Sequence, residues 1–363
     1  MTLATVQTIK EIKPIENADR IEVAKVLGWE VVVKKNEFKV GDLCIYVEID
    51  TLIPNKDWSK FLFTGSHVDD EYHRLRTIKL RGQVSQGLVL LINTINSNTL
   101  LKMINERKDF FCAEGLDVTE YLGIKKYESP EINIGSRSNR IKARSFPSFI
   151  RKTDEVRIQS NLELLEQLKH KPYYITQKLD GTSFTCYKYN NKFGVCSRNM
   201  ELLNPKQPKG FIQFIKREIR KLLGKTKKEV PATNTYWRMA EKYNIESWLP
   251  DGFAIQGEIV GPGIQRNKLG LDELRLFIFN VWYIKEQRHL YFRELDFFTD
   301  IIEYVPEILD GDSFNYTFEE LMTIAENQTY PNGSSAEGIV VRNLDQTISF
   351  KVVSNKFLLE YGE

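Results

Sequence analysis

The sequence predicts an α+β protein in two parts: a small N-terminal β-barrel, then a larger domain of antiparallel sheets with flanking helices. Three observations predict it. The chain has 363 residues, enough for two domains with substantial cores. Its first third reads as short strands between turns, and the remainder mixes longer strands with helical segments. With 42% hydrophobic and 28% charged residues, the composition is that of a globular protein rather than a disordered one.

Residues 1–128 form the predicted barrel. Residues 20–35 alternate apolar and polar side chains, with Gly28 at the turn between two strands. Residues 40–54 open on a Gly-Asp turn and continue as a strand, and residues 74–92 predict two strands around "RGQVSQG". Several short strands at this spacing are typical of a small barrel. The pattern resembles an OB-fold module.

A polar, basic stretch divides the two parts. Residues 129–145, "SPEINIGSRSNRIKARS", are weakly periodic and predict a linker. We expect the second domain to span 146–363. Within it, residues 205–224 predict an amphipathic helix with one basic face, and the ordinary interpretation of that face is a solvated helix surface.

Bulk properties exclude several classes of protein. The net charge is only +2, so any nucleic-acid binding must come from local patches. The N-terminus lacks the blocks of a signal peptide, and no apolar run reaches the length of a membrane span. The four cysteines and four histidines are scattered, which indicates reduced thiols and argues against a zinc site. We therefore expect a cytoplasmic protein.

Residues 175–183, "ITQKLDGTS", place Lys178 at the end of a predicted buried strand. Alone, Lys-x-Asp-Gly is weak evidence and fits a plain hairpin turn. Five segments follow it in order: "SRNMEL" (197–202), "QGEIVG" (256–261), "LFIFNV" (276–281), "AEGIVVRN" (336–343) and "SFKVV" (349–353). Together they add Glu258, Glu337 and Lys351 to predicted strands. Unpaired buried charges are costly, so this pattern favours a pocket for a metal, a triphosphate and a base.

The ordered set resembles nucleotidyltransferase motifs I, Ia, III, IIIa, IV and V of ATP-dependent ligases and capping enzymes. Within that superfamily, with its ATP-grasp-like ligase domain, the chain is most similar to ATP-dependent RNA ligases that carry an OB-fold domain before the catalytic one. The resemblance implies ATP and Mg²⁺ or Mn²⁺ as cofactors. It also implies sealing of RNA with 3′-OH and 5′-phosphate ends or nicks, through lysyl-AMP and RNA-adenylate, as in RNA repair.

The resemblance implies roles for the groups around the phosphate. Lys178 would attack the α-phosphate of ATP, which requires its pKa to be lowered by burial or a nearby cation. Asp180 and Glu337 would hold the metal ion, mainly through water molecules. Lys351 would contact the same phosphate. Motif V of many relatives has a second lysine, which is missing here or supplied from elsewhere, with Lys356 as one option.

Further residues would bind the rest of the nucleotide. Glu258 would accept hydrogen bonds from the ribose, and Gln177 would line the nucleotide site. Phe279 would stack on adenine, although a plain core phenylalanine is the alternative in so apolar a stretch. Arg198 would contact the phosphate of the nucleotide or of the RNA end, unless it is an ordinary turn residue.

Two other segments are candidates for RNA contact. "KLRGQVSQG" (79–87) concentrates Arg81 and Gln83 between glycines, which suits either an RNA-contacting edge or a simple bulged hairpin. In the linker, Arg140 and Lys142 are the candidates.

Two alternative functions compete with that of an RNA ligase. A DNA ligase or mRNA-capping guanylyltransferase is expected to carry an OB domain after motif V, and only twelve residues follow Lys351. A non-catalytic nucleic-acid-binding relative is expected to have lost at least one of Lys178, Glu258, Glu337 and Lys351. We expect a monomer that acts on RNA and does not bind membranes.

Overall fold

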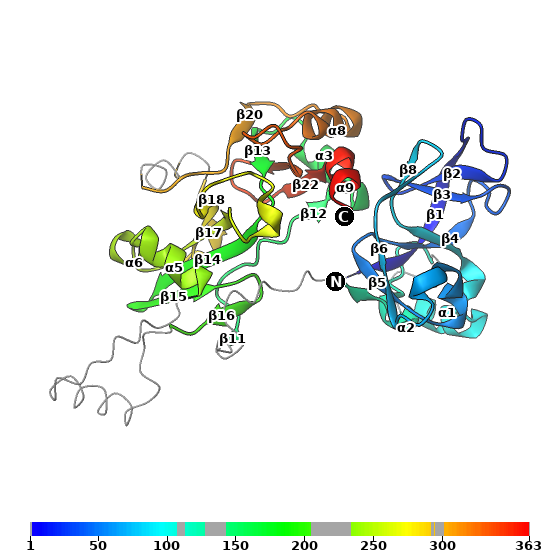
Figure 1. The fold of residues 1–363 in the computed structure, drawn as a ribbon, viewed down its shortest axis with the longest axis horizontal. Helices are drawn as coiled ribbons and strands as arrows, with labels where there is room; N and C mark the ends of the chain where they lie inside the picture. The colour runs from blue at the N-terminus through cyan, green and yellow to red at the C-terminus, as the bar shows by residue number, and fades with distance from the viewer. Residues whose placement is uncertain are drawn as a thin grey trace, which may run out of the picture.

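The computed structural model describes residues 2–106, 113–127, 143–204, 234–291, 294 and 301–362. Figure 1 shows an N-terminal part, coloured blue to cyan, beside a larger C-terminal part, with helix α9 (Asn355–Tyr361) near their boundary. The predicted helix 205–224 and the linker residues Arg140 and Lys142 lie outside the described residues.

The N-terminal part is built on two antiparallel sheets and a hairpin. The first sheet has the order β3-β2-β1-β4-β9 and the second the order β10-β5-β6. The strands of the first are β1 (Ala4–Pro14), β2 (Ile21–Val26), β3 (Trp29–Lys34), β4 (Leu43–Val47) and β9 (Leu88–Leu91). The others are β5 (Thr51–Pro54), β6 (Tyr72–Leu75), β10 (Lys125–Lys126) and the hairpin β7 (Ile78–Leu80) and β8 (Gln83–Ser85), with helices α1 (Ser97–Asn105) and α2 (Thr119–Leu122).

Alternation along the strands explains how this part builds its core. In β4, Ile45 and Val47 enter one buried cluster, whereas Cys44 and Tyr46 enter a second one. Successive side chains of a strand point to opposite faces, so one strand serves both clusters. The sheet therefore packs on both faces, as a curled half-barrel does.

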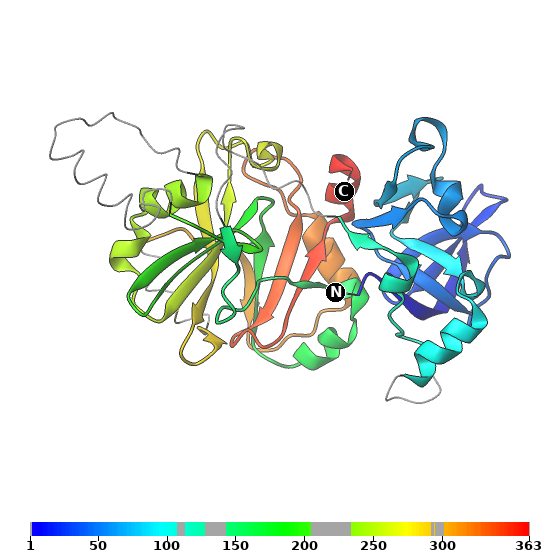
Figure 2. The same cartoon turned by 90° about the horizontal axis from the view of Figure 1, so that it is seen from below.

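The C-terminal part contains two larger sheets, seen edge to edge in Figure 2. The seven-stranded sheet has the order β11-β16-β15-β14-β17-β18-β19, and the five-stranded sheet the order β12-β22-β21-β13-β20. The first comprises β11 (Ala143–Ser145), β14 (Thr182–Tyr189), β15 (Lys192–Cys196), β16 (Met200–Leu202), β17 (Phe253–Val260), β18 (Arg275–Tyr283) and β19 (Arg288–His289). The second comprises β12 (Val156–Arg157), β13 (Tyr173–Lys178), β20 (Glu307–Gly311), β21 (Gly338–Asn343) and β22 (Ser349–Val353).

The remaining described helices are short and flank these sheets. They are α3 (Glu163–Leu168), α5 (Thr235–Lys242), α6 (Ile245–Trp248) and α8 (Phe318–Glu326). Among the described strands, pairing is antiparallel except between β12 and β22, and one isolated parallel bridge joins Ile278 to Tyr304. The α+β fold class and its antiparallel sheets are confirmed. Residues 143–145, assigned to the linker from the sequence, form β11 and pair with β16.

The two parts touch through polar and apolar contacts. Asp50 accepts hydrogen bonds from Arg157 at 2.7 Å and from Arg74 at 2.9 Å. The backbone N–H of Gly28 donates to the carbonyl of Gln159 at 2.9 Å. A Cβ on Gly28 would lie 2.9 Å from the Cα of Gln159, so this glycine is required for close approach rather than for a left-handed turn.

In the described part of the chain, no helix is long and apolar enough to cross a membrane. Cys44, Cys186 and Cys196 are buried free thiols, and Cys112 lies outside the described residues.

Candidate active site

A pocket of about 680 Å³ opens where the two C-terminal sheets meet the N-terminal part. This size suits a nucleotide-sized ligand. Eight predicted site residues line it: Gln177, Lys178, Asp180, Arg198, Glu258, Phe279, Glu337 and Lys351. They come from segments spread over more than 170 residues of sequence, so the fold brings together the set that the motifs predicted. Arg81 and Gln83 lie elsewhere, on the hairpin β7–β8.

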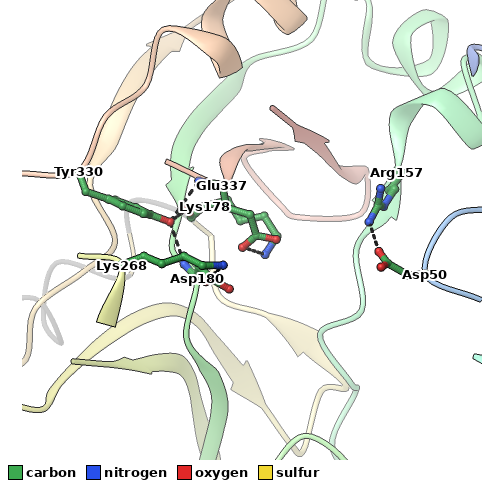
Figure 3. A network of polar contacts seen from close by, with 7 residues as sticks. All are labelled: Asp50, Arg157, Lys178, Asp180, Lys268, Tyr330 and Glu337. Atoms are coloured by element: carbon green, nitrogen blue, oxygen red, sulfur yellow. Dashed lines mark hydrogen bonds and ion pairs between the residues drawn. The ribbon is translucent and has the colours of Figure 1, made fainter. Parts of the chain in front are cut away.

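Lys178 ends β13 and faces the carboxylate of Glu337, the residue just before the neighbouring strand β21. The last register pair of β13 and β21 is Lys178 with Gly338, which sets Glu337 opposite the lysine. The Lys178 Nζ lies 2.6 Å from the Glu337 Oε2, with both side chains largely buried (Figure 3). The chain then turns sharply into β14. A Cβ on Gly181 would lie 2.4 Å from the carbonyl oxygen of Ile259, which explains the glycine of the Lys-x-Asp-Gly segment.

The expected lowering of the Lys178 pKa is wrong for the free protein. Burial lowers this pKa, but the carboxylates of Glu337, Glu258 and Asp180 outweigh burial and hold it above its ordinary value. The reason is the surplus of negative charge around one ammonium group. In this state the amine is protonated and ion-paired.

Asp180 is held by a lysine that the sequence analysis missed. The Lys268 Nζ lies 2.7 Å from the Asp180 Oδ2, and both side chains are buried. The same ammonium lies 4.4 Å from the ring centroid of Phe357 and 4.5 Å from that of Tyr361, both on α9. The ion pair therefore links the turn after Lys178 to the C-terminal helix. The only sequence signal for Lys268 is its position shortly after "QGEIVG".

The three residues before Lys268 have an unusual backbone conformation that places its side chain next to Asp180. Gln265, Arg266 and Asn267 have φ values of +41°, +59° and +52°, a run in the left-handed region that L-residues rarely adopt. The Asn267 side chain bonds both the N–H and the carbonyl of Leu271, at 3.1 and 2.8 Å, which stabilises the loop. Such strain is common beside functional sites, and Gln265 lines the pocket.

Glu258 carries the most strongly raised carboxyl pKa in the pocket. It lies on β17, next to β14. Burial raises its pKa to about 8, with Glu337 and Asp180 adding to the effect and Lys178 opposing it. Burial is the main cause, because it disfavours the charged carboxylate, so Glu258 keeps its proton to a higher pH than an exposed glutamate does.

The pKa of Lys351 is shifted in the opposite direction. Burial lowers its pKa to about 7, and Arg157 and Lys178 lower it further while Glu337 opposes them. The parallel pairing of β12 with β22 sets Arg157 beside Lys351. Arg157 lines the pocket, whereas Lys356 is exposed on α9 and does not. Arg157, and not Lys356, is therefore the second cation beside Lys351.

Three further predicted residues form part of the rim and wall of the pocket. Phe279 is half-buried on β18 and lines the pocket, with the Arg342 guanidinium 5.9 Å from its ring centroid. The Gln177 amide donates to the Thr329 carbonyl at 3.1 Å. Arg198 is partly exposed and pairs with Asp154 at 2.6 Å. Phe279 is thus a wall residue rather than a fully buried core phenylalanine.

The acidic groups fit a metal ion held through water better than one bound directly. Glu337 is paired with Lys178 and Asp180 with Lys268. Among the residues that the structure describes, no three His, Cys, Asp or Glu side chains form a direct ligand cluster. Magnesium commonly keeps several waters and uses one or two carboxylates. The carboxylates of Asp180 and Glu337, which both line the pocket, are compatible with such an ion.

Tyr330 is a second buried residue that sequence reasoning missed. It is 1% exposed and lies in the loop "QTYPNGSS" before β21. Its hydroxyl bonds the backbone beside Lys178, Asp180 and Glu337 (Figure 3). No periodicity or motif in the sequence marks this tyrosine.

A lysine at a strand end, paired with a carboxylate in a nucleotide-sized pocket lined by further acidic and basic groups, defines a protein of the covalent nucleotidyltransferase class. An RNA ligase family model matches residues 171–357, and an OB-fold domain model matches residues 3–92. The chain belongs to the RNA ligase family. The predicted family, its N-terminal OB fold and its enzyme class are confirmed.

Solved structures of an RNA ligase from Naegleria gruberi resemble the whole chain at 32% identity. A mutant with ATP and Mn gives a TM-score of 0.82 and covers 100% of both chains. An apo mutant gives 0.81 and covers 98% of this chain and 97% of that one. A complex with PPi gives 0.79, with 99% and 98% covered. The comparison with curated proteins finds no match.

Proposed function

We propose that this RNA ligase is ATP-dependent and seals 3′-OH and 5′-phosphate RNA ends through an AMP adduct on Lys178. The observation that carries the proposal is the Lys178–Glu337 pair at 2.6 Å in a pocket lined by all the predicted nucleotide residues. Relatives that have been solved with ATP and Mn, and with AMP and Mn, support the choice of ATP and a divalent ion.

The first step forms a phosphorus–nitrogen bond and breaks a phosphorus–oxygen bond. The Lys178 Nζ attacks the α-phosphate, and pyrophosphate leaves. The amine must first lose a proton, and the nearest acceptor is the Glu337 carboxylate at 2.6 Å. The 5′-phosphate of RNA then displaces Lys178 from AMP. Finally the 3′-OH attacks that activated phosphate, and AMP leaves.

The remaining pocket residues have distinct roles in this proposal. Asp180 and Glu337 would hold Mg²⁺ or Mn²⁺ through water, and the ion would supply positive charge that offsets the negative charge on the phosphates. Lys351 and Arg157 supply positive charge at the phosphates. Glu258 bonds the ribose and Phe279 stacks on adenine, with Gln177 beside them. Arg198 contacts the nucleotide phosphate or the RNA end.

RNA contacts outside the pocket are assigned to the hairpin β7–β8 and the linker. Arg81 is exposed at the hairpin tip and has a φ of +49°. The Gln83 amide instead donates to the Glu30 carboxylate at 2.7 Å, so Gln83 shapes the hairpin more than it contacts RNA. Arg140 and Lys142, a monomeric state and a cytoplasmic location stay predictions, as do the domain limits 1–128, 129–145 and 146–363.

Covalent labelling tests the proposed function. We expect radioactive AMP from ATP, and none from GTP, to become attached to the peptide containing "ITQKLDG" in the presence of Mg²⁺ or Mn²⁺. Lys178→Ala should abolish the label. Lys188→Ala, at the far end of β14, is the matched control and should label normally. Labelling of Lys178→Ala would refute the assignment, and labelling by GTP would favour a guanylyltransferase.

A further inference from the structure

The Tyr330 hydroxyl uses its full hydrogen-bonding capacity on three backbone groups of the pocket. It donates to the carbonyl of Lys178 at 3.1 Å. It accepts from the N–H of Asp180 at 3.0 Å and from the N–H of Glu337 at 3.1 Å. A phenolic oxygen has one proton to donate and can accept at its lone pairs, so the three bonds leave little room for another partner.

These three bonds lie where two strands separate. The ladder between β13 and β21 ends at the pair Lys178–Gly338. Beyond this pair, the segment after β13 turns through Asp180 into β14. The segment before β21 arrives through Glu337 from the preceding loop. Backbone hydrogen bonds between the strands are no longer available there. The Tyr330 hydroxyl takes the place of these backbone bonds and links the two segments to each other (Figure 3).

The loop that carries Tyr330 is itself anchored. The Asn332 amide and the Ser334 hydroxyl both donate to the carbonyl of Lys268, at 3.0 and 2.7 Å. The Tyr330 N–H donates to the Ser334 carbonyl at 2.8 Å, which closes the loop on itself. The ring of Tyr330 packs in a buried cluster with Leu179. The hydroxyl is therefore held in a fixed position.

We propose that Tyr330 is a positioning residue for nucleotide transfer, fixing the Lys178 amine and the Glu337 carboxylate relative to each other through their backbones. The proposal rests on the proposed function of Lys178. Tyr330 does not line the pocket, so it acts without touching the nucleotide. Small displacements of reacting groups have large kinetic effects, which makes such a brace important for rate.

Tyr330→Phe keeps the ring and removes the three bonds. We expect the maximal rate of Lys178 adenylylation to fall by about 10- to 100-fold. The KM for ATP should change by less than about threefold, because the groups that bind the nucleotide remain. Sealing of pre-adenylylated RNA, in which Lys178 is not the nucleophile, should fall much less. This split between steps is what a merely structural role would not produce.

Tyr46→Phe is the matched control. Tyr46 is also 1% exposed, and its hydroxyl donates to the Gln86 carbonyl at 3.1 Å, within the N-terminal part and without a bond to Lys178, Asp180 or Glu337. It should lower thermal stability without slowing adenylylation. If Tyr330→Phe fails to fold, Ser334→Ala loosens the same loop and should give a smaller fall in rate with an unchanged KM.

Two outcomes would overturn the inference. One is a wild-type rate of adenylylation in Tyr330→Phe. The other is an equal loss in adenylylation and in sealing of pre-adenylylated RNA. Both are distinct from failure of the proposed function, in which the wild-type protein itself would not label.

Discussion

The pocket around Lys178 and the hairpin β7–β8 both carry positive charge, but they hold it in different surroundings. In the pocket, Lys178 and Lys268 are buried and lie 2.6 and 2.7 Å from carboxylates. On the hairpin, Lys79 and Arg81 are exposed to solvent. Buried pairs interact strongly and are screened little by salt, whereas exposed charges are weakened by it. Pocket substitutions should therefore change the rate of chemistry, and hairpin substitutions the salt-dependent binding of RNA.

The largest effect is expected at Glu337. Glu337→Gln keeps the shape of the side chain but removes the charge beside Lys178 and the phosphates. Losing one preorganised charge commonly costs about 2.7–4 kcal/mol, so adenylylation should slow by about 10²–10³-fold. Single-turnover labelling measures this rate. Glu303→Gln, in the surface pair with Arg275, is the control and should behave as wild type. A near-normal rate in Glu337→Gln would show that the Glu337 carboxylate has no part in adenylylation.

An intermediate effect is expected from the titration of Lys351. Its pKa of about 7 means that the side chain is positive below that pH and neutral above it. Affinity for a methylene analogue of ATP that cannot transfer AMP should therefore weaken as pH rises from 7 to 9, by up to about tenfold per unit.

Lys351→Met supplies the comparison for that titration. Without the ammonium, affinity should be weaker at pH 7 and should fall less steeply up to pH 9; the fall that remains in both proteins comes from Glu258, whose pKa is raised to about 8. Equilibrium titrations of both proteins across this range provide the measurement. Parallel curves for the two proteins would show that Lys351 does not act on the phosphate through its charge.

The smallest effect is expected on the hairpin. Arg81→Ala should leave adenylylation unchanged and weaken RNA binding, lowering the slope of log affinity against log salt by about one. Lys39→Ala, an exposed cation on another loop of the same domain, is the control. An unchanged salt slope in Arg81→Ala would show that the hairpin does not contact RNA.

Strand positions and pocket residues were predictable because each follows from a local rule. The alternation before Lys178 predicted β13, and the Lys-x-Asp-Gly turn predicted the step into β14. Charged residues on predicted strands indicated a polar pocket, and the structure contains such a pocket. The same rules failed in "RGQVSQG", where a third short strand, β8, forms because it pairs with β7.

Tyr330, Lys268 and Arg157 were not predictable for a common reason. Each acts through contacts with residues distant in sequence, and each lies in a loop or a very short strand without periodicity. The prediction of a lowered Lys178 pKa failed for a related reason, because the direction of the pKa shift depends on how many carboxylates the fold gathers around the amine. Counting charges along a chain does not give their distances.

The contact between the two parts also has an optical consequence. Trp29 is fully buried and shares an apolar cluster with Phe357 and Leu358 of α9. Its ring centroid lies 6.0 Å from the guanidinium of Arg157. Indole emission shifts to longer wavelength as the surroundings become wetter. Separation of the two parts would expose this indole to water. Because the chain has five tryptophans, the difference in emission between the wild type and Trp29→Phe is what would report whether the parts are docked.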